Sequence, residues 1–376
     1  MDFTVIATYR CDSRCSMCYV WQHPTMPQDE ITVETLEKIP GGIDNLNITG
    51  GEPTLRRDLP EIVRVLHPKA RTLEISSNGL HADRLEQIVR DYPNTKIRFS
   101  LEAPGGTSDE IRGEKDGFAK KLAGLRRLRD LGAADIGFAA VIQDDNAADI
   151  VQLYRFARTE RVELATSALH NAFQFHKGDN FPYDRVKLAR HIEGLITEML
   201  RTFSVKDWFR GYLNLGLIAK TLGQDRLITC TAGSDFLFVD PSSDVYACNV
   251  RPDLVIGNLA RQSWGEVTTG AAARQVREKV RACHHNCWMV TSARTAMRSR
   301  RIPVLPKWQP LRWVVANRLR VALGMPIPFA KYVDYRAVKE STGAPTRGRF
   351  LNVTIKREPQ TPSPDRYSSL GPYFNR

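Results

Sequence analysis

The chain has 376 residues and a hydrophobic content of 42%, values that are ordinary for a globular protein with one large core and a smaller module, and its formal net charge of +12 comes from its last part. It has no run of eighteen apolar residues, and the amino terminus MDFTVIATYR lacks the sections of a signal peptide, which argues against membrane-spanning and secreted classes. We therefore expect a cytoplasmic protein whose seven cysteines are metal ligands or catalysts rather than disulfide partners.

Short apolar runs alternate with segments of helical period up to about residue 168. The runs occupy residues 3–9, 46–50, 72–77, 96–102, 136–142 and 162–169, and helical segments between them include 32–39, 59–66, 82–92 and 118–132. A strand followed by a helix, repeated about six times, predicts parallel strands with right-handed crossovers. The pattern fits a partial (β/α) barrel or an open doubly wound sheet, and both bind ligands at the carboxyl ends of strands.

The later part of the chain changes character twice. Residues 183–203 and 208–222 read as helices, and residues 235–248 read as a hairpin that opens a small module with four cysteines. From Trp288 to Arg376 there are 17 Lys and Arg against 4 Asp and Glu, with 10 of the 21 prolines. We predict a core at 1–205, a cysteine-bearing module at 206–288 and a basic, proline-rich extension at 289–376.

Three cysteines, Cys11, Cys15 and Cys18, follow directly after the first predicted strand with the spacing C-x3-C-x2-C. Three thiolates fit three corners of a [4Fe–4S] cluster and leave the fourth iron open to another ligand. A structural zinc knuckle with a remote fourth cysteine is the alternative.

Two motifs together resemble a known family. CSMCY, with an aromatic residue after the third cysteine, and TGGEP after the second strand resemble the signature of radical S-adenosylmethionine enzymes. The resemblance implies a partial (β/α)6 barrel of radical SAM type and S-adenosylmethionine chelated to the open iron by its amino and carboxylate groups. It also implies a 5′-deoxyadenosyl radical that abstracts a substrate hydrogen, and an external electron donor such as flavodoxin or ferredoxin.

The same resemblance implies a cofactor site at the strand ends. Glu52 would accept the cationic amino group, Gly50 and Gly51 would permit close backbone approach, and Met17 would touch adenine. The Ser-Asn pair in ISSNG would contact ribose or carboxylate. The full expected set is Met17, Tyr19, Gly50, Gly51, Glu52, Pro53, Ser77, Asn78, Ser100, Glu102 and Arg112.

The remaining cysteines form a complete ligand set of four: Cys230, Cys248, Cys283 and Cys287. Their context, with CTAG, YAC and a closing C-x3-C, resembles the auxiliary-cluster module called SPASM in its shortened form, twitch, which implies one fully ligated auxiliary [4Fe–4S] cluster. A zinc site stays open as the alternative, and His284 or His285 could replace a cysteine. A cluster beside the substrate could accept an electron, which favours net oxidation.

The basic extension has an imperfect amphipathic pattern. Helical placement puts Trp308, Leu311, Val315, Leu319 and Ala322 on one side, and Arg318 falls within that stripe. Three interpretations compete: a helix docked by this stripe on the protein's own barrel, a membrane-surface contact that would suit a lipid-linked substrate and a peripheral location, and, less favoured, a nucleic-acid or acidic-partner surface.

We therefore expect a radical S-adenosylmethionine oxidoreductase that acts on an unactivated C–H bond of a sugar-, lipid- or natural-product-type substrate. The alternatives are a peptide maturase that forms a cross-link, against which the chain begins almost at its first strand, and an iron–sulfur or zinc regulatory protein that binds nucleic acid. The sequence does not rank His170, His176, Tyr183 and Asp240 as acid–base groups.

Overall fold

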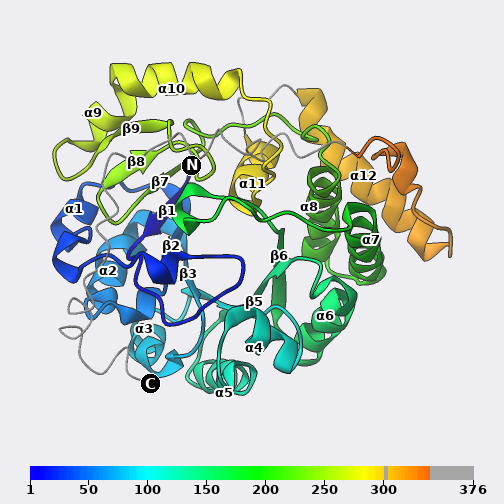
Figure 1. Ribbon diagram of the computed structural model, residues 1–376, viewed down its shortest axis with the longest axis horizontal. Coiled ribbons are helices and arrows are strands. Elements are labelled where there is room, and N and C mark those ends of the chain that lie inside the picture. Colours follow the sequence, from blue (N-terminus) through cyan, green and yellow to red (C-terminus); the bar gives the residue numbers. More distant parts are fainter. Residues whose placement is uncertain (300–303, 339–376) are drawn as a thin grey trace.

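The computed structural model describes residues 1–299 and 304–338 (Figure 1). Its centre is one curved sheet with the strand order β6-β5-β4-β3-β2-β1-β7-β8-β9. Strands β1 to β6 run parallel in chain order, which confirms the predicted α/β core. They span β1 (Asp2–Ile6), β2 (Ile43–Thr49), β3 (Ala70–Ser77), β4 (Lys96–Ser100), β5 (Asp135–Ile142) and β6 (Glu163–Ala168).

Helices cover the outer face of this curved sheet, so that the strands line the inside of a partial barrel (Figure 1). The helical segments predicted at 32–39, 59–66, 82–92 and 118–132 each overlap a core helix, and two further core helices, at 106–112 and 150–159, lie outside the segments named. The core helices are α1 (Val33–Glu37), α2 (Leu59–Leu66), α3 (Glu86–Asp91), α4 (Gly106–Arg112), α5 (Gly117–Asp130) and α6 (Ile150–Thr159). All parallel strands therefore present their carboxyl ends at one edge, where the first cysteine loop also lies.

Two long helices, α7 (Arg185–Arg201) and α8 (Val205–Thr221), close the barrel beside β6. Asp184 caps α7 by accepting the amide hydrogen of Lys187, and Ser204 caps α8 by accepting that of Asp207. Side-chain oxygens at these positions satisfy amides that the first helical turn leaves unpaired.

The cysteine-bearing module continues the same sheet. β7 (Phe236–Val239) pairs parallel with β1, and β8 (Asp244–Tyr246) and β9 (Val255–Asn258) add antiparallel strands, which confirms the predicted hairpin. α9 (Trp264–Thr269), α10 (Ala271–Arg281) and α11 (Val290–Arg298) follow. The proposed boundaries at residues 205 and 288 stay predictions.

The basic extension contributes α12 (Val304–Ala322), which packs on α7 and α8 (Figure 1). The helix docks through Trp313 and Val314, which are buried, and the Trp313 ring lies 5.6 Å from the ring of Tyr212 on α8. The predicted docking stripe is wrong, because Val315 and Leu319 are each 59% exposed. Helical period shows which residues share a face but not which face turns inward. Residues 339–376 lie outside the described part of the chain.

None of the helices within residues 1–299 and 304–338 combines the length and the apolar character that a membrane crossing requires.

Candidate functional site

The first cysteine group lies in the loop between β1 and the 3-10 helix Val20–Gln22. Cys11 and Cys15 are buried and Cys18 is half-buried. Burial raises the pKa of the Cys11 thiol well above its usual value, and the charges of Cys15 and Glu52 add to the effect. Burial likewise raises the pKa of Cys18 to about 11. Thiolates are costly here without a compensating cation, so this donor set fits an iron cluster.

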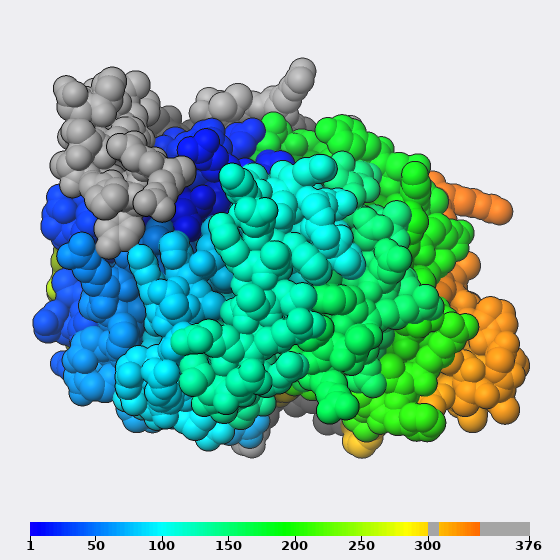
Figure 2. Space-filling model, turned by 90° about the horizontal axis from the view of Figure 1, so that it is seen from below, coloured from blue at the N-terminus to red at the C-terminus, as the bar shows by residue number. Residues whose placement is uncertain are grey.

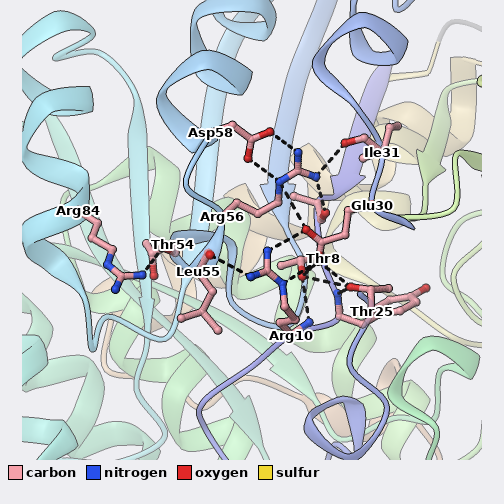
Figure 3. A network of polar contacts seen from close by, with 12 residues as sticks. Thr8, Arg10, Thr25, Glu30, Ile31, Thr54, Leu55, Arg56, Asp58 and Arg84 are labelled. Carbon is pink, nitrogen blue, oxygen red and sulfur yellow. Dashed lines mark hydrogen bonds and ion pairs between the residues drawn. The ribbon is translucent and has the colours of Figure 1, made fainter. Parts of the chain in front are cut away.

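A buried polar network holds the start of this loop (Figure 3). The Glu30 carboxylate accepts hydrogen bonds from the Arg10 guanidinium at 2.8 and 2.9 Å, from the Thr25 hydroxyl at 2.7 Å and from the Thr8 hydroxyl. Arg56 donates to the carbonyl of Ala7 at 3.0 Å and lies 3.7 Å from Glu30. None of these residues was predicted, since nothing in the sequence links Glu30 or Arg56 to the cysteines.

Gly50 and Gly51 bring the end of β2 against the cysteine loop. A Cβ on Gly50 would lie 2.4 Å from the Thr8 carbonyl oxygen, and one on Gly51 would lie 2.2 Å from that of Arg10. The amides of Gly51 and Glu52 donate to these two carbonyls, each at 2.7 Å. The glycines are therefore required for contact between two loops of the chain itself; approach to a cofactor stays a prediction.

Glu52 lies at the centre of the strand ends and is fully buried. Its Oε1 atom accepts from the Thr54 amide at 2.9 Å, the Thr54 hydroxyl at 2.6 Å and the Ser77 hydroxyl at 2.9 Å, and its Oε2 atom accepts from the Asn78 amide at 2.5 Å. Burial raises the pKa of this carboxyl, although the hydrogen bonds oppose the shift. The structure thus brings together Glu52, Ser77 and Asn78 and adds Thr54, which sequence reasoning missed. Pro53 follows at the start of a 3-10 helix, Pro53–Leu55.

Asn78 also reaches the cysteine loop. Its Nδ2 atom donates to Asp12 at 2.6 Å and to the Ser13 hydroxyl at 3.0 Å, and His81 lies 2.7 Å from the other oxygen of Asp12. Burial alone would raise the pKa of Asp12, but His81 and Asn78 outweigh it and lower that pKa. These contacts tie the loop between the first two cysteines to the end of β3.

A second buried charge network lies at the end of β4. Glu102 accepts from the Arg112 guanidinium at 3.0 Å and from the Val141 amide at 2.7 Å. Arg112 also donates to Glu114 at 2.9 Å, and Glu114 pairs with Lys121, whose side chain is wholly buried. Glu102 and Arg112 were predicted site residues. Glu114 was missed because it lies in the loop after α4, and Lys121 was missed because it is one of many basic residues on α5.

Three further predicted residues flank these networks. Met17 is buried beside Cys15, and its carbonyl accepts a hydrogen bond from Asn180 at 2.9 Å. Tyr19 accepts from the Lys177 ammonium at 3.0 Å, and that ammonium lies 4.2 Å from the centre of the Tyr19 ring. Ser100, the last residue of β4, is half-buried. Their roles toward a cofactor stay predictions.

The second cysteine group is assembled from three separate segments. Cys230 precedes β7, Cys248 follows β8, and Cys283 and Cys287 follow α10. A hydrogen bond from Cys248 lowers the pKa of Cys287 to about 5. Burial raises the pKa of Cys230, and the charges of Cys287 and Cys283 add to that rise. The Arg226 guanidinium donates to the Cys287 sulfur at 3.5 Å. The fold therefore brings Cys248 into contact with Cys287 and places Cys230 within the range of the charges of Cys283 and Cys287.

The side chains of the second cysteine group, all within the described chain, are not arranged as the ligands of one metal ion. Across residues 1–299 and 304–338, no three Cys, His, Asp or Glu side chains are arranged around one point as ligands of a single metal ion. His284 is exposed, and His285 has a buried Nδ1 atom without a hydrogen-bond partner in the described chain.

A polar cavity separates the end of β6 from the second cysteine group. Its walls include Leu169, His170, Asn171, Asn180, Pro182, Arg185, Lys220, Thr221, Val250, Asn286 and Cys287. Three buried polar atoms of these walls have no hydrogen-bond partner among the described residues: His170 Nε2, Thr221 Oγ1 and Asn286 Oδ1. Unpartnered buried atoms in one cavity indicate a place where a polar ligand or water completes the hydrogen bonding.

His170 stands out among the acid–base residues that the sequence left unranked. Its Nδ1 atom lies 3.2 Å from the Ala168 carbonyl, so Nδ1 carries the hydrogen and Nε2 presents a lone pair. Burial, together with the Lys220 ammonium, lowers the pKa of His170 to about 3. By contrast, Tyr183 is 94% exposed, and the His176 ring stacks on that of His23 at 4.1 Å. Asp240 accepts the Asp244 amide hydrogen in a turn.

Two known families match separate parts of the chain, and each part contains one of the two cysteine groups. Residues 5–157 match the family described as the radical SAM superfamily, and residues 230–288 match SPASM, described as an iron–sulfur cluster-binding domain. The two matches contain the first and the second cysteine group, respectively.

Individual relatives cover different parts of the chain. A probable GTP 3′,8-cyclase of Metallosphaera sedula is 26% identical over 190 residues, which are 47% of this chain and 60% of the relative, so the chain spans less than two thirds of that protein. The sporulation killing factor maturation protein SkfB of Bacillus subtilis is 23% identical over 292 residues, 74% of this chain and 67% of the relative.

A solved structure supports the architecture. The structure titled native anSMEcpe with bound AdoMet and Cp18Cys peptide has a TM-score of 0.58 at 14% identity and covers 86% of this chain and 99% of its own. At this identity the likeness concerns the fold, a partial barrel followed by a cysteine-bearing module.

Proposed function

The chain belongs to the radical S-adenosylmethionine superfamily and carries a SPASM iron–sulfur domain, and on this premise we propose that it is an oxidoreductase acting on an unactivated C–H bond. The observation that carries the proposal is the cavity between the end of β6 and Cys287, because it joins the barrel to the second cysteine group. The cavity has a volume of about 50 Å³, so it would admit one polar group of a substrate, and that group would lie beside an electron acceptor.

Two clusters are proposed. Cys11, Cys15 and Cys18 would hold a [4Fe–4S] cluster that binds S-adenosylmethionine, and the other four cysteines would hold one auxiliary [4Fe–4S] cluster. The burial of these thiols and the repulsion between their thiolate forms support this assignment, since iron would relieve both costs. When bound, S-adenosylmethionine and its cluster would supply a 5′-deoxyadenosyl radical that removes one hydrogen atom from the substrate.

Residues of the chain would bind and orient S-adenosylmethionine and the substrate. Oε2 of Glu52 accepts only the Asn78 amide hydrogen among the described residues, which leaves acceptor capacity for the methionine ammonium group. His170 Nε2 would accept a hydrogen bond from a substrate hydroxyl or N–H group within the cavity. Loss of a further electron to the auxiliary site, with a proton, would complete a two-electron oxidation.

Reconstitution and product analysis test this proposal. Extracts treated with the anaerobically reconstituted enzyme, S-adenosylmethionine and a reductant should gain a compound lighter than its precursor by two hydrogen atoms, together with 5′-deoxyadenosine. Extracts treated with the Cys11→Ala variant serve as the control and should gain neither. His170→Phe should keep its iron but lose the oxidised product. A product of unchanged mass would refute net oxidation.

Peptide cross-linking is the second candidate, and the match to SkfB favours it because that match covers 74% of this chain, which is more than the barrel alone. A cross-link also removes two hydrogen atoms from the substrate. The same mass comparison separates the candidates, since the lighter compound would then be a peptide instead of a sugar, lipid or other small natural product.

A further inference from the structure

One face of α12 turns apolar side chains outward. Of the 13 exposed large hydrophobic residues in the described chain, six lie on this helix or within three residues of its end: Trp308, Leu311, Val315, Leu319, Leu323 and Met325. Figure 1 shows α12 outside α7 and α8, and Figure 2 shows this part of the chain at the margin of the molecule. The apolar face is therefore accessible to a partner.

The opposite face fixes the orientation of the helix. Trp313, Val314 and Asn317 are buried, and Asn317 donates to the Trp313 carbonyl at 2.9 Å. The Trp313 ring contacts those of Tyr212 and Tyr332 at 5.6 and 6.1 Å. Turning the apolar face inward would expose this packed side, so the outward face is a stable property of the fold.

Neighbouring residues enlarge the exposed patch. Phe203 is 91% exposed and Val205 is 56% exposed, and both lie where α7 connects to α8. The Arg318 guanidinium on α12 lies 5.6 Å from the centre of the Phe203 ring and 5.4 Å from that of Trp208. Arg318 thereby links the helix to the protruding aromatic ring beside it.

Charge limits what can cover this patch. From Lys279 to Val333 the sequence contains no Asp or Glu, while α12 carries Arg312, Arg318 and Arg320. A second copy of the chain would bring another +12 charge and the same arginines. Residues 339–376 are also basic, with 7 Lys and Arg against 3 Asp and Glu. An anionic occupant is favoured over either.

We propose that this face of α12, with Phe203, rests on an anionic lipid membrane. Trp308, Leu311, Val315 and Leu319 would enter the interface, and Arg312 and Arg318 would lie at the phosphates. Strongly protruding side chains favour lipid over an acidic protein, because a bilayer adapts to them while a protein would need a matching hollow. The proposal does not depend on the reaction that the enzyme catalyses.

Vesicle binding by the purified full chain tests the proposal. Vesicles of phosphatidylcholine with phosphatidylglycerol should bind the protein, vesicles of phosphatidylcholine alone should bind it much less, and added salt should weaken binding. Leu319→Asp should lower the partition coefficient by about tenfold or more. Arg312→Gln should lower it by about fivefold, the equivalent of about 1 kcal/mol for one basic residue at such a surface.

Matched variants separate membrane contact from misfolding and from general charge. Val255→Asp introduces the same charge on β9, where Val255 is 37% exposed, and Arg90→Gln removes one exposed arginine from α3. Both should bind vesicles as the parent does, and all four variants should melt at the parent's temperature. The proposal would be overturned if the parent protein did not bind anionic vesicles, or if the Leu319→Asp variant bound them as strongly as the parent. A dimer that Leu319→Asp dissociates, without any vesicle binding, would identify a second copy as the occupant and would equally overturn it.

Discussion

The two cysteine groups are built in different ways. The first places Cys11, Cys15 and Cys18 in one short loop, whereas the second collects its four cysteines from three segments between Cys230 and Cys287. Three donors leave a coordination position open, and four donors fill a cluster. Three cysteines would enclose a cluster less completely than four, so we expect the first loop to depend more on support from residues outside it.

The supports of the two groups differ accordingly. Buried charges hold the first loop, with Glu30 joined to Arg10 and Arg56. Packing holds the second, because the wholly buried Trp288 follows Cys287 directly and donates from its indole nitrogen to the Leu213 carbonyl at 2.7 Å. We therefore expect the first cysteine group to be sensitive to the loss of a buried charge and the second to a change in packing.

Removing the cysteines should give the largest effect. The parent, after anaerobic reconstitution, should hold about eight iron and eight sulfide per chain. Changing Cys11, Cys15 and Cys18 to Ala should leave about half of the iron and abolish S-adenosylmethionine cleavage.

Changing the other four cysteines to Ala should also halve the iron, but cleavage to 5′-deoxyadenosine should continue. Iron analysis and chromatography of the nucleoside measure both results. Full iron with normal cleavage in the first variant would be incompatible with the assignment.

Neutralising Glu30 should break the support of the first loop. Glu30→Gln leaves the half-buried Arg10 and the buried Arg56 without a shared carboxylate, so the free energy of unfolding should fall by about 3–5 kcal/mol. Urea unfolding measures the change. The control is Glu61→Gln, which removes an exposed partner of Arg64 and should leave the free energy of unfolding nearly unchanged. If both changes lowered the free energy of unfolding equally, the buried network around Glu30 would contribute no more to stability than an exposed ion pair.

Filling the space under Trp288 should disturb the second group alone. A Cβ on Gly216 of α8 would lie 1.8 Å from the Trp288 ring, so Gly216→Ala should cost about 3 kcal/mol and lower the iron of the auxiliary site. S-adenosylmethionine cleavage should persist. Gly211→Ala is the matched control on the same helix, since its Cβ would have no neighbour closer than 3.6 Å. Loss of cleavage along with the iron would mean that the two groups are not supported independently.

The carboxylate beside the first group should give the smallest effect. Glu52→Gln should weaken S-adenosylmethionine binding by about 1.5–3 kcal/mol, the range for a hydrogen bond to a charged group, while iron content stays normal. Anaerobic calorimetry measures the binding. Glu34→Gln, which alters an exposed carboxylate on α1, should bind as the parent does. Unchanged affinity in Glu52→Gln would remove the proposed role.

The sequence by itself determined that the core strands run parallel, that a hairpin follows them and that the cysteines fall into two sets. These features are local: alternating strands and helices fix a parallel sheet with right-handed crossovers, and the carboxyl ends of its strands share one edge. Glu52 follows β2, and Ser77 and Asn78 lie at the end of the neighbouring strand β3, so the family resemblance could assign them to one site before any coordinates.

Only the tertiary structure decided which residues support the site and which face of α12 is buried. Glu30 pairs with Arg10, and Glu114 accepts a hydrogen bond from Ser13, which lies 101 residues earlier in the chain. The side chain of Lys121 is wholly buried, and a charged side chain in a sequence does not reveal whether it will be buried. The same limit applies to α12. Its period groups Trp308 with Leu319 and Trp313 with Asn317, but contact with Tyr212 on α8 selects the second pair for burial. Side-chain packing between distant segments makes that choice, and no local pattern encodes it.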